Sequence, residues 1–449
     1  SYELKSELDP CPNGWRIPSY YGRETPNNNL SFFGKKDWNN DDSNVNLRQL
    51  FPDAVNVNLN GIKVYPGLGM DFTQAQGGVR NLGVLPNPGA YVYYPNSSSP
   101  NAPVGAMFQD NNANGGLWSA TFGYDGARLF SMISDAYRTN TTVGLHAIYN
   151  NQTNPTKTGN AVRCMKDPNL LKIGDFVTEY FKNQKEDYRI GLENPNSYIV
   201  VNQDVLEIPV NKAFSVYNQL LSDKDMLPSD DLLAKVYWTT NPDLVQEVSI
   251  INGKRENRNS LIAVKLAPDQ TGNAVISLQN GNDSSPIYWT WHIWKPADDP
   301  TVNTVTYTTE APIPVLYNFV NPTTSKLPPL TTEFMDRNLG AENSAIESGL
   351  ANGLHYQWGR KDPIPSFAGA NTEIYIANRN SSSHADIFTL RKAAGNFTPV
   401  NSDEYATLFT KFYEDYGSTQ SIRHLKIRDN ILYSVHNPMT FLYVRRMGV

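Results

Sequence analysis

The residues that could do chemistry are few in this chain, and its two cysteines come first. Cys11 and Cys164 are the only cysteines among 449 residues. In an oxidising compartment they have one possible pairing, whereas in the cytosol they would be two buried free thiols. A bridge between them would stabilise the fold by about 5 kcal/mol in the chain-entropy model. Neither belongs to a CxxC pair or a linked histidine pattern, so we expect neither to be catalytic.

The histidines are scattered and match no catalytic or zinc pattern. The sequence contains no HExxH segment, P-loop, GxGxxG or GxSxG motif. Arg360, Lys361 and Asp362 follow Trp358 and could form an anion site, but an Arg–Asp pair that fixes a turn is the simpler interpretation. We therefore expect no catalytic residue, no metal ligand and no cofactor. The six histidines are His146, His292, His355, His384, His424 and His436.

One acidic segment has side chains that calcium prefers. Asp37, Asp41 and Asp42 lie beside Asn39 and Asn40 in the sequence DWNNDD, and carboxylate and amide oxygens suit calcium. The segment lacks the glycine and the distal glutamate of an EF-hand loop. A solvated loop without metal is the simpler interpretation.

The most aromatic stretch is WTWHIW at 289–294. We expect strand alternation to put its three tryptophans on one face, with Thr290 and His292 on the other. Rows of aromatic rings bind sugars, but they also build the cores of β-sandwiches. We expect these tryptophans to be core residues.

The composition favours an extracellular bacterial β-protein. The net charge is −6 and the basic residues are spread along the chain, so we expect no nucleic-acid partner. No run of 18 apolar residues occurs that would predict a transmembrane segment. The chain has 30 prolines, 30 glycines and 25 tyrosines, which indicate many turns between short strands. The start, Ser1 to Lys5, is no signal peptide, so we expect a mature, processed or excerpted chain.

Alternation of apolar and polar residues predicts the elements between 196 and 296. Seven short segments of period two, separated by turns such as Asn252-Gly253, are typical of an immunoglobulin-like β-sandwich. A helix could follow the second strand at 211–221, with Phe214 and Tyr217 on its apolar face beside Leu221. The predicted strands are 197–201, 205–210, 234–239, 245–250, 261–265, 274–278 and 287–294.

The rest of the chain is less regular. Short strand-like pieces occur at 90–94 and 117–121, and the segment 126–136 fits a strand and a helix equally well. Ser402 could cap a helix that Gly417 ends. The expected division is an irregular block at 1–168, a linker at 169–195, the sandwich at 196–296, an extended Pro- and Thr-rich linker at 297–333, and a second irregular block at 334–449.

Several phrases carry a resemblance to one family. MDRNLGA at 335–341 and YQWGRKDP at 356–363 resemble the Fibrobacter succinogenes major paralogous domain, which recurs in Bacteroidetes surface proteins and often accompanies fimbrillin-like proteins. The sandwich that ends in WTWHIW is similar to the β-domain that often precedes it. Four further phrases are similar to parts of the same family: CPNGWRIP at 11–18, WSA at 118–120, VRC at 162–164 and NPMTF at 437–441.

The resemblance implies a fold, a disulfide and a location. The fold would be a loop-rich α+β domain like that of C-type lectins, beside the all-β immunoglobulin-like sandwich. Cys11 and Cys164 match the family's cysteines, which supports their pairing. The family implies surface display and adhesion, with no associated catalytic residue. The chain would therefore be extracellular, at the cell surface and associated with the outer membrane.

The order of the phrases departs from the family pattern. In the family the MDRNLGA and QWGRKDP phrases precede the CPxGWR phrase, whereas here they follow it. Three explanations stay open: a fragment of a tandem array, closure of 334–449 with 1–168 within one chain, or head-to-tail pairing between chains, which would build a filament. Half domains would expose core surface and unpaired strand edges, so we favour one composite domain, made within the chain or between chains.

These observations predict a non-enzymatic surface protein, fimbria-associated or an adhesin, that displays a lectin-like head on a β-sandwich spacer. Its partner would be a host or bacterial surface glycan or protein, other fimbrial subunits or copies of itself. Ring stacking and amide hydrogen bonds would make the contact. The alternatives are a carbohydrate-binding accessory module of a surface glycan-degrading complex and a structural stalk or filament subunit. The candidate ligand-binding residues are Trp38, Asn39, Asn40, Asn112, Asn114 and Trp118.

Overall fold

The computed structural model of the protein describes separate stretches of the chain. They are residues 5–18, 44–46, 61–65, 68–74, 83–94, 105–109, 114–123, 126–133, 145–148, 159–167, 191, 194–217, 232–251, 260–281, 287–308, 313–314, 326–327, 331–348, 350–364, 374–376 and 398–400.

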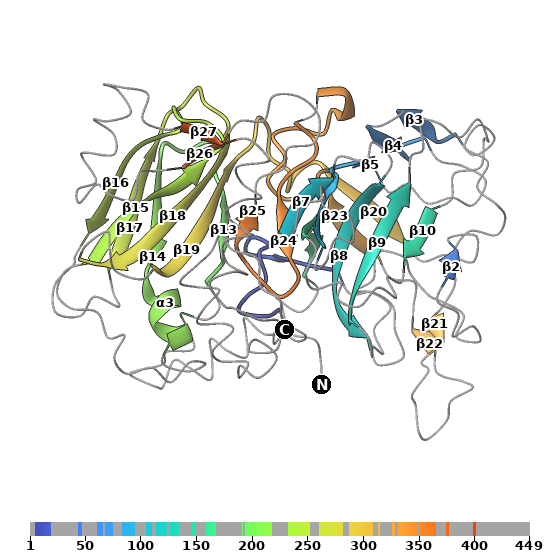
Figure 1. Ribbon diagram of the computed structural model, residues 1–449, viewed down its shortest axis with the longest axis horizontal. Coiled ribbons are helices and arrows are strands. Elements are labelled where there is room, and N and C mark those ends of the chain that lie inside the picture. The colour runs from blue at the N-terminus through green and yellow to red at the C-terminus, as the bar shows by residue number, and fades with distance from the viewer. Residues whose placement is uncertain are drawn as a thin grey trace, which may run out of the picture.

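The described residues form six sheets of short strands with very little helix. The helical elements there are α3 (Asn211–Val216), the 3-10 turn η7 (Ile346–Ser348) and the single helical residue Gly191. This part of the protein is therefore mostly β. The lectin-like α+β domain is not shown, and the helix expected from Ser402 to Gly417 lies outside the described residues. Figure 1 shows two β-rich lobes side by side.

All seven strands expected between 196 and 296 are present. β13, β19, β18 and β15 are neighbours in one sheet, and β14, β17 and β16 form another. The two sheets share one buried apolar cluster, so this segment, called the sandwich below, is a two-sheet packing. The strands are β13 (Ser197–Ile199), β14 (Val205–Pro209), β15 (Leu232–Thr239), β16 (Val245–Ile251), β17 (Leu261–Leu266), β18 (Gly272–Asn280) and β19 (Ile287–Lys295).

The three tryptophans of β19 are core residues, but they do not share a face. Trp289 and Trp291 are completely buried in the sandwich cluster, whereas Trp294 is completely buried in a second cluster. The expectation of one common face was wrong, because successive strand residues alternate and Trp294 lies three positions beyond Trp291. Strand β19 is buried at every residue, so both of its faces are covered by protein.

The helix expected at 211–221 is present in its described part. It is α3, Asn211–Val216, with Phe214 and the following Tyr217 buried in the sandwich cluster. Leu221, expected on the same face, lies outside the described residues.

The second lobe is built from segments that are far apart in the sequence. In one sheet the strand order is β1–β12–β23–β20, where β20 is Thr304–Thr308. In another sheet β11 pairs with both β8 (Asn114–Gly123) and β24. Residues 5–18, 159–167 and 331–364 are called the composite lobe below. Its strands are β1 (Trp15–Arg16), β11 (Gly159–Ala161), β12 (Met165–Lys166), β23 (Thr331–Met335), β24 (His355–Gln357) and β25 (Pro363–Ile364).

The described strands of the two irregular blocks thus pair within one chain. Met165 is opposite Phe334, and Ala161 is opposite His355. This is the pairing that closure within the chain requires. The boundaries of the expected domains stay a prediction.

The segment expected as the second linker contributes a strand. β20 (Thr304–Thr308) pairs with β23 along five residues. Its sequence TVTYT consists of residue types that favour strands, so a Thr-rich stretch without clear periodicity can still complete a sheet. A part of the second irregular block, β26 (Ile374–Ile376), pairs with β15 of the sandwich in the same way.

The remaining strands lie mostly around the composite lobe. The segment that fitted strand and helix equally is the strand β9. In the described residues no helix is long and apolar enough to cross a membrane. These strands are β2 (Asn44–Asn46), β3 (Lys63–Tyr65), β4 (Gly69–Asp71), β5 (Val84–Pro86), β6 (Ala90–Tyr94), β7 (Gly105–Gln109), β8 (Asn114–Gly123), β9 (Gly126–Ile133), β10 (Leu145–Ile148), β21 (Ile313–Pro314), β22 (Lys326–Leu327) and β27 (Thr398–Val400).

Candidate functional site at the disulfide and strand β19

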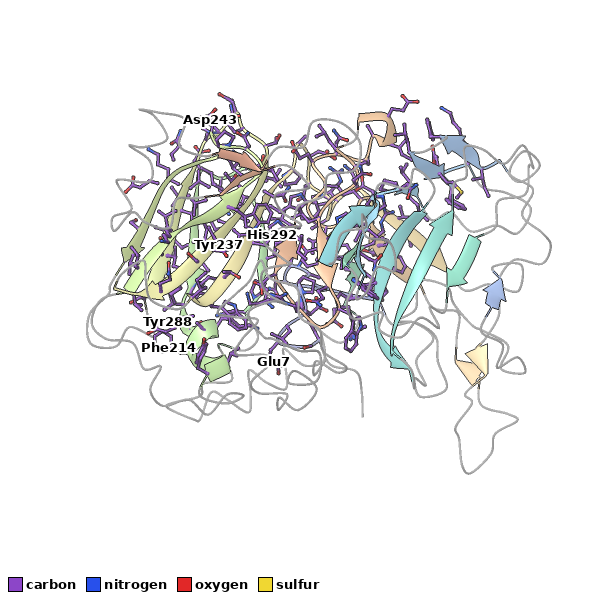
Figure 2. The ribbon with its side chains drawn as sticks, in the orientation of Figure 1. Glu7, Phe214, Tyr237, Asp243, Tyr288 and His292 are labelled. Carbon is purple, nitrogen blue, oxygen red and sulfur yellow. A yellow bond between two sulfur atoms is a disulfide. The ribbon has the colours of Figure 1, made fainter. Side chains whose placement is uncertain are left out.

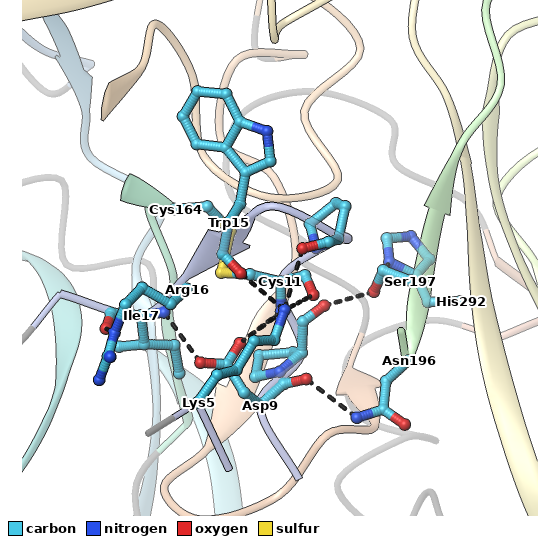
Figure 3. The surroundings of a disulfide bond; sticks show 12 residues. Lys5, Asp9, Cys11, Trp15, Arg16, Ile17, Cys164, Asn196, Ser197 and His292 are labelled. Carbon is cyan, nitrogen blue, oxygen red and sulfur yellow. Dashed lines mark hydrogen bonds and ion pairs between the residues drawn. A yellow bond between two sulfur atoms is a disulfide. The ribbon is translucent and has the colours of Figure 1, made fainter. Parts of the chain in front are cut away.

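Cys11 and Cys164 form a disulfide, as the resemblance implied. Their Cα atoms are 5.9 Å apart, 153 positions separate them in sequence, and neither side chain is exposed. Figure 3 shows the bond and the polar groups around it. The bridge ties the first residues of the composite lobe to the segment that follows β11. A bond of this kind points weakly to an oxidising compartment.

Lys5 organises the loop that carries Cys11. Its ammonium nitrogen donates hydrogen bonds to the carbonyl oxygens of Cys11 at 2.5 Å, Pro12 at 2.9 Å and Trp15 at 2.6 Å. Burial lowers the pKa of Lys5, and the nearby Asp9 carboxylate opposes that shift. The three carbonyl groups converge on one cation and so fix the turn between Cys11 and Trp15.

The carboxylate of Asp9 closes the same loop from its other side. One oxygen accepts the backbone N–H of Cys11 at 2.8 Å, and the other accepts that of Ile17 at 3.0 Å. Arg16 of β1 lies 3.9 Å from the carboxylate of Asp167. The loop from Asp9 to Ile17, called the Cys11 loop below, is therefore held by buried charges as one unit.

The second face of β19 contacts the YQWGRKDP phrase. The Lys361 ammonium donates to the hydroxyl of Thr290 at 2.7 Å and to its carbonyl at 2.9 Å, and it pairs with Asp362 at 2.5 Å. It also lies 4.3 Å from the centre of the Trp289 ring, a cation–π distance. The Thr290 hydroxyl donates to Asp362. Lys361 and Asp362 thus form a buried charge pair within this turn, and the expected Arg–Asp pair stays a prediction.

A buried polar chain starts at His292, the next residue on that face. Its Nδ1 lies 3.1 Å from the Ser197 hydroxyl, which donates to the carbonyl of Pro10 at 2.5 Å. Its Nε2 lies 2.9 Å from the side-chain oxygen of Asn273, whose amide nitrogen donates to the carbonyl of Gly340 at 2.8 Å. The polar chain therefore runs from Pro10, the residue before the CPNGWRIP phrase, through the sandwich to Gly340 of the MDRNLGA phrase.

Trp294 adds a further contact between β19 and the composite lobe. Its indole N–H donates to the carbonyl oxygen of Ala341 at 2.9 Å. Its ring packs in the second buried cluster with Met335, Leu339 and Trp358 of the composite lobe. Thr290, His292 and Trp294 alternate along β19. This strand face therefore contacts the YQWGRKDP and MDRNLGA phrases directly and reaches Pro10 through Ser197.

Ser197, His292 and Asn273 have the order of a nucleophile, a base and an orienting residue. Ser197 and His292 are each only 1 % exposed, and the Ser197 hydroxyl is used by Pro10. A substrate could not reach this hydroxyl in the structure. This chain of buried hydrogen bonds is therefore a structural link between the lobes.

A small cavity of about 30 Å³ lies beside the Pro10 end of this hydrogen-bonded chain, where the Cys11 loop meets the turn after β24. Asp9, Arg16, Gln357 and Arg360 line it together with Trp118. Its size suits a bound water molecule and is too small for a sugar ring.

Of the six predicted ligand-binding residues, Asn114 and Trp118 belong to the described stretches. Trp118 is 2 % exposed, and its indole N–H donates to the carbonyl of Tyr356 at 2.5 Å. Its ring is therefore a core group here and offers no open face for stacking. Asn114 is the first residue of β8. Trp38, Asn39, Asn40 and Asn112 lie outside the described residues.

The contact between the sandwich and the composite lobe is called the joint below. Sequence reasoning missed the residues that make it. Lys5, Asn196, Ser197 and Asn273 have side chains that satisfy buried backbone groups. A signal was present for Ser197, since it shares a predicted strand face with Ile199 and Val201, and a polar residue on an otherwise apolar strand face indicates a buried hydrogen-bonding role.

In the described stretches no group of three or more His, Cys, Asp or Glu side chains could hold a metal, and Asp37 to Asp42 lie outside them. No protein-family model, curated protein or solved structure matches the chain. The resemblance to the Fibrobacter succinogenes major paralogous domain therefore stays a prediction.

Proposed function

We propose that the protein is a non-enzymatic bacterial surface protein, fimbria-associated or an adhesin, that lies outside the cell in association with the outer membrane. The observation that carries this proposal is the fully buried disulfide between Cys11 and Cys164. Such bridges form and persist in oxidising surroundings and are rare in the cytosol. The bridge joins two of the phrases on which the family resemblance rests.

The composite lobe would be the displayed head, with a C-type-lectin-like fold, and the sandwich its immunoglobulin-like support. Docking through Thr290, His292 and Trp294 supports a fixed orientation of the two. A head held in this way presents its loops at a constant angle. It loses less conformational entropy on binding than a head on a flexible linker would.

The partner would be a surface glycan or protein, another fimbrial subunit or a copy of this chain. Trp38, Asn39, Asn40 and Asn112 are the proposed contacts, because an indole ring with amide groups suits both sugars and adaptable protein surfaces. Asn114 remains with them, whereas the burial of Trp118 argues against its taking part.

The location is tested on intact native cells. Labelling with a membrane-impermeant amine reagent, followed by non-reducing peptide mapping, should find labelled peptides and the Cys11–Cys164 link in one molecule. Protein that is labelled only after lysis, with both thiols free, would overturn the proposal.

The function is tested with the purified chain on glycan and surface-protein arrays. Specific retention without chemical change of the ligand supports an adhesin, and Trp38→Ala should weaken it at least tenfold. Lys166→Gln is the matched control, because Lys166 is exposed and pairs with Glu333. Release of a product from a retained glycan would contradict the non-enzymatic proposal. Retention confined to the substrates of a glycan-degrading complex would indicate the accessory module, and concentration-dependent filaments without retention would indicate a stalk subunit.

A further inference from the structure

His292 lies where the sandwich and the composite lobe meet, as its label in Figure 2 shows. Its ring is 1 % exposed, and both ring nitrogens are engaged, one with Ser197 and the other with Asn273. Beyond these two side chains are the backbone carbonyls of Pro10 and Gly340, both in the composite lobe. A change in the charge of this ring therefore acts directly on the joint.

The hydrogen bonds fix where the proton of the neutral ring sits. Asn273 donates its amide N–H to Gly340, so its oxygen faces Nε2 of His292 and must accept a proton from it. Nδ1 is then bare and accepts from Ser197. The single Ser197 proton is shared between Nδ1 and the carbonyl of Pro10.

A second proton on the ring would bring a charge without a counter-charge. Ser197 could still accept from Nδ1 while donating to Pro10, but every member of the chain is neutral, so the cation stays buried and uncompensated. The charged groups on the surrounding elements are already engaged: Lys5 with Asp9 and three carbonyls, Lys361 with Asp362, Arg337 with Asp298 and Asp336, Lys295 with Ala267, and Glu342 with Thr271.

We propose that His292 is a proton-sensitive latch between the two lobes. While its ring is neutral, it holds the Cys11 loop and the segment around Gly340 against β19. When the ring is protonated in acid, the latch opens and the composite lobe loosens from the sandwich, with the sandwich core intact. This inference does not depend on which partner the protein binds.

The size of the effect follows from linkage. Burial lowers the pKa of His292 from its ordinary 6.5 to about 3, and no nearby charge contributes to the shift. When the joint opens, the His292 ring enters water and regains its ordinary pKa. The ring therefore binds a proton in the open state at pH values where it stays neutral in the closed state. The equilibrium constant for opening of the joint does not change with pH above 6.5, and it rises as the pH falls toward 3. Between pH 7.5 and pH 5.0 it should rise about 30-fold.

Hydrogen exchange of the full chain tests the latch. Amide protection would be measured at pH 7.5 and 5.0 in the Cys11 loop, in 194–200 and in 336–342. The measured rates are divided by the intrinsic exchange rates at each pH. These segments should lose protection about 30-fold in acid, whereas β17 in the sandwich core should not change. Equal behaviour of the joint and β17, whether both hold or both open, would overturn the proposal.

His292→Gln gives the decisive comparison, because glutamine can donate and accept but does not titrate in this range. The acid-dependent loss at the joint should shrink from about 30-fold to less than about threefold. His355→Gln is the matched control. His355 is also buried and its pKa is lowered to about 4, but its Nε2 faces the carbonyl of Gly89 rather than the sandwich. This control should leave the joint response unchanged, and a loss of the response in His355→Gln alone would contradict the assignment.

If His292→Gln does not fold, the titration of the His292 ring in the wild-type protein tests the latch instead. Its NMR titration should show a neutral ring at pH 5.0 in the closed form. A ring that charges near its ordinary pKa while the joint keeps its protection would overturn the latch.

Discussion

Trp291 and His292 are consecutive residues of β19 and lie on opposite faces of the strand, one in the core of the sandwich and the other against the composite lobe. The strand is therefore shared by two packing layers. Both buried clusters contain tryptophans from β19. Because of this sharing, the sandwich is attached through its own core strand, and the orientation of the composite lobe depends on the packing of that strand.

The two faces of β19 should respond differently to the loss of an indole N–H. Trp294 donates to Ala341, whereas the N–H of Trp291 has no partner in the described residues. Both substitutions to phenylalanine remove similar ring volume, but Trp294→Phe also strands a buried carbonyl. We expect Trp294→Phe to cost about 1–3 kcal/mol more than Trp291→Phe in urea unfolding. Equal costs would mean that the Ala341 bond contributes nothing to the joint.

The strands of the sandwich could be predicted because alternation is a local property of the sequence. Every predicted segment from 197 to 294 contains a strand. The same alternation shows which residues share a face, yet it does not show what covers that face. Thr290 and His292 were correctly placed opposite Trp289, but their partners Asp362 and Ser197 come from other segments. Such partners follow from tertiary packing and carry no spacing signal.

The joint itself could be predicted only in outline. The phrases around Cys11, Gly340 and Lys361 were noticed as phrases, and they are the segments that dock on strands β13, β18 and β19 of the sandwich. Lys5 was not noticed, because a lone lysine before a turn is an ordinary surface residue in a sequence. Its role depends on three carbonyls that converge only in the folded loop. The strand β20 was missed for a related reason, since its pairing partner β23 is distant in sequence.

Removal of the disulfide should weaken the composite lobe. The bridge closes a loop of 153 positions, and its loss relaxes that constraint on the unfolded chain. We expect the double variant Cys11→Ala, Cys164→Ala to lose about 2–5 kcal/mol of unfolding free energy. Urea unfolding with and without reductant checks this, since reduced wild-type protein should resemble the variant. A wild-type midpoint that reductant does not move would show that the bridge is dispensable.

Gly340 should tolerate no side chain. Its φ is +85°, and an added Cβ would lie 2.5 Å from Cγ of Leu354. Its carbonyl also receives the Asn273 bond of the joint, so a backbone shift there would be transmitted to β18. We expect Gly340→Ala to destabilise the fold by about 2–4 kcal/mol, partly from the backbone conformation and partly from the clash.

A double-mutant cycle separates these two causes. In a Leu354→Ala background the space for the new methyl exists, so Gly340→Ala should cost only the backbone part, about 1 kcal/mol. The same cost in both backgrounds would show that the clash with Leu354 is not the reason.

Lys212 should make the protein more stable at alkaline pH. It lies in α3 and is 2 % exposed, and burial lowers its pKa from 10.5 to about 7, with Glu7 opposing the shift. Between these values the unfolded chain holds a proton that the folded protein lacks. The unfolding free energy therefore rises with pH from 7 to 10.5, by up to about 1.4 kcal/mol per pH unit from this group. Below pH 7 both states hold the proton, and this group adds no further pH dependence.

Lys212→Met removes the titrating group and keeps an unbranched side chain of similar length. Urea unfolding between pH 7.5 and 9.5 should show a shallower rise in the variant than in the wild type. Some slope should remain, because burial also lowers the pKa of Lys5 and of Lys361. Lys166→Met is the matched control, because Lys166 is exposed, and it should keep the wild-type slope. If Lys212→Met and the wild type rose in parallel, the buried amine would have to be charged in the folded protein throughout this range.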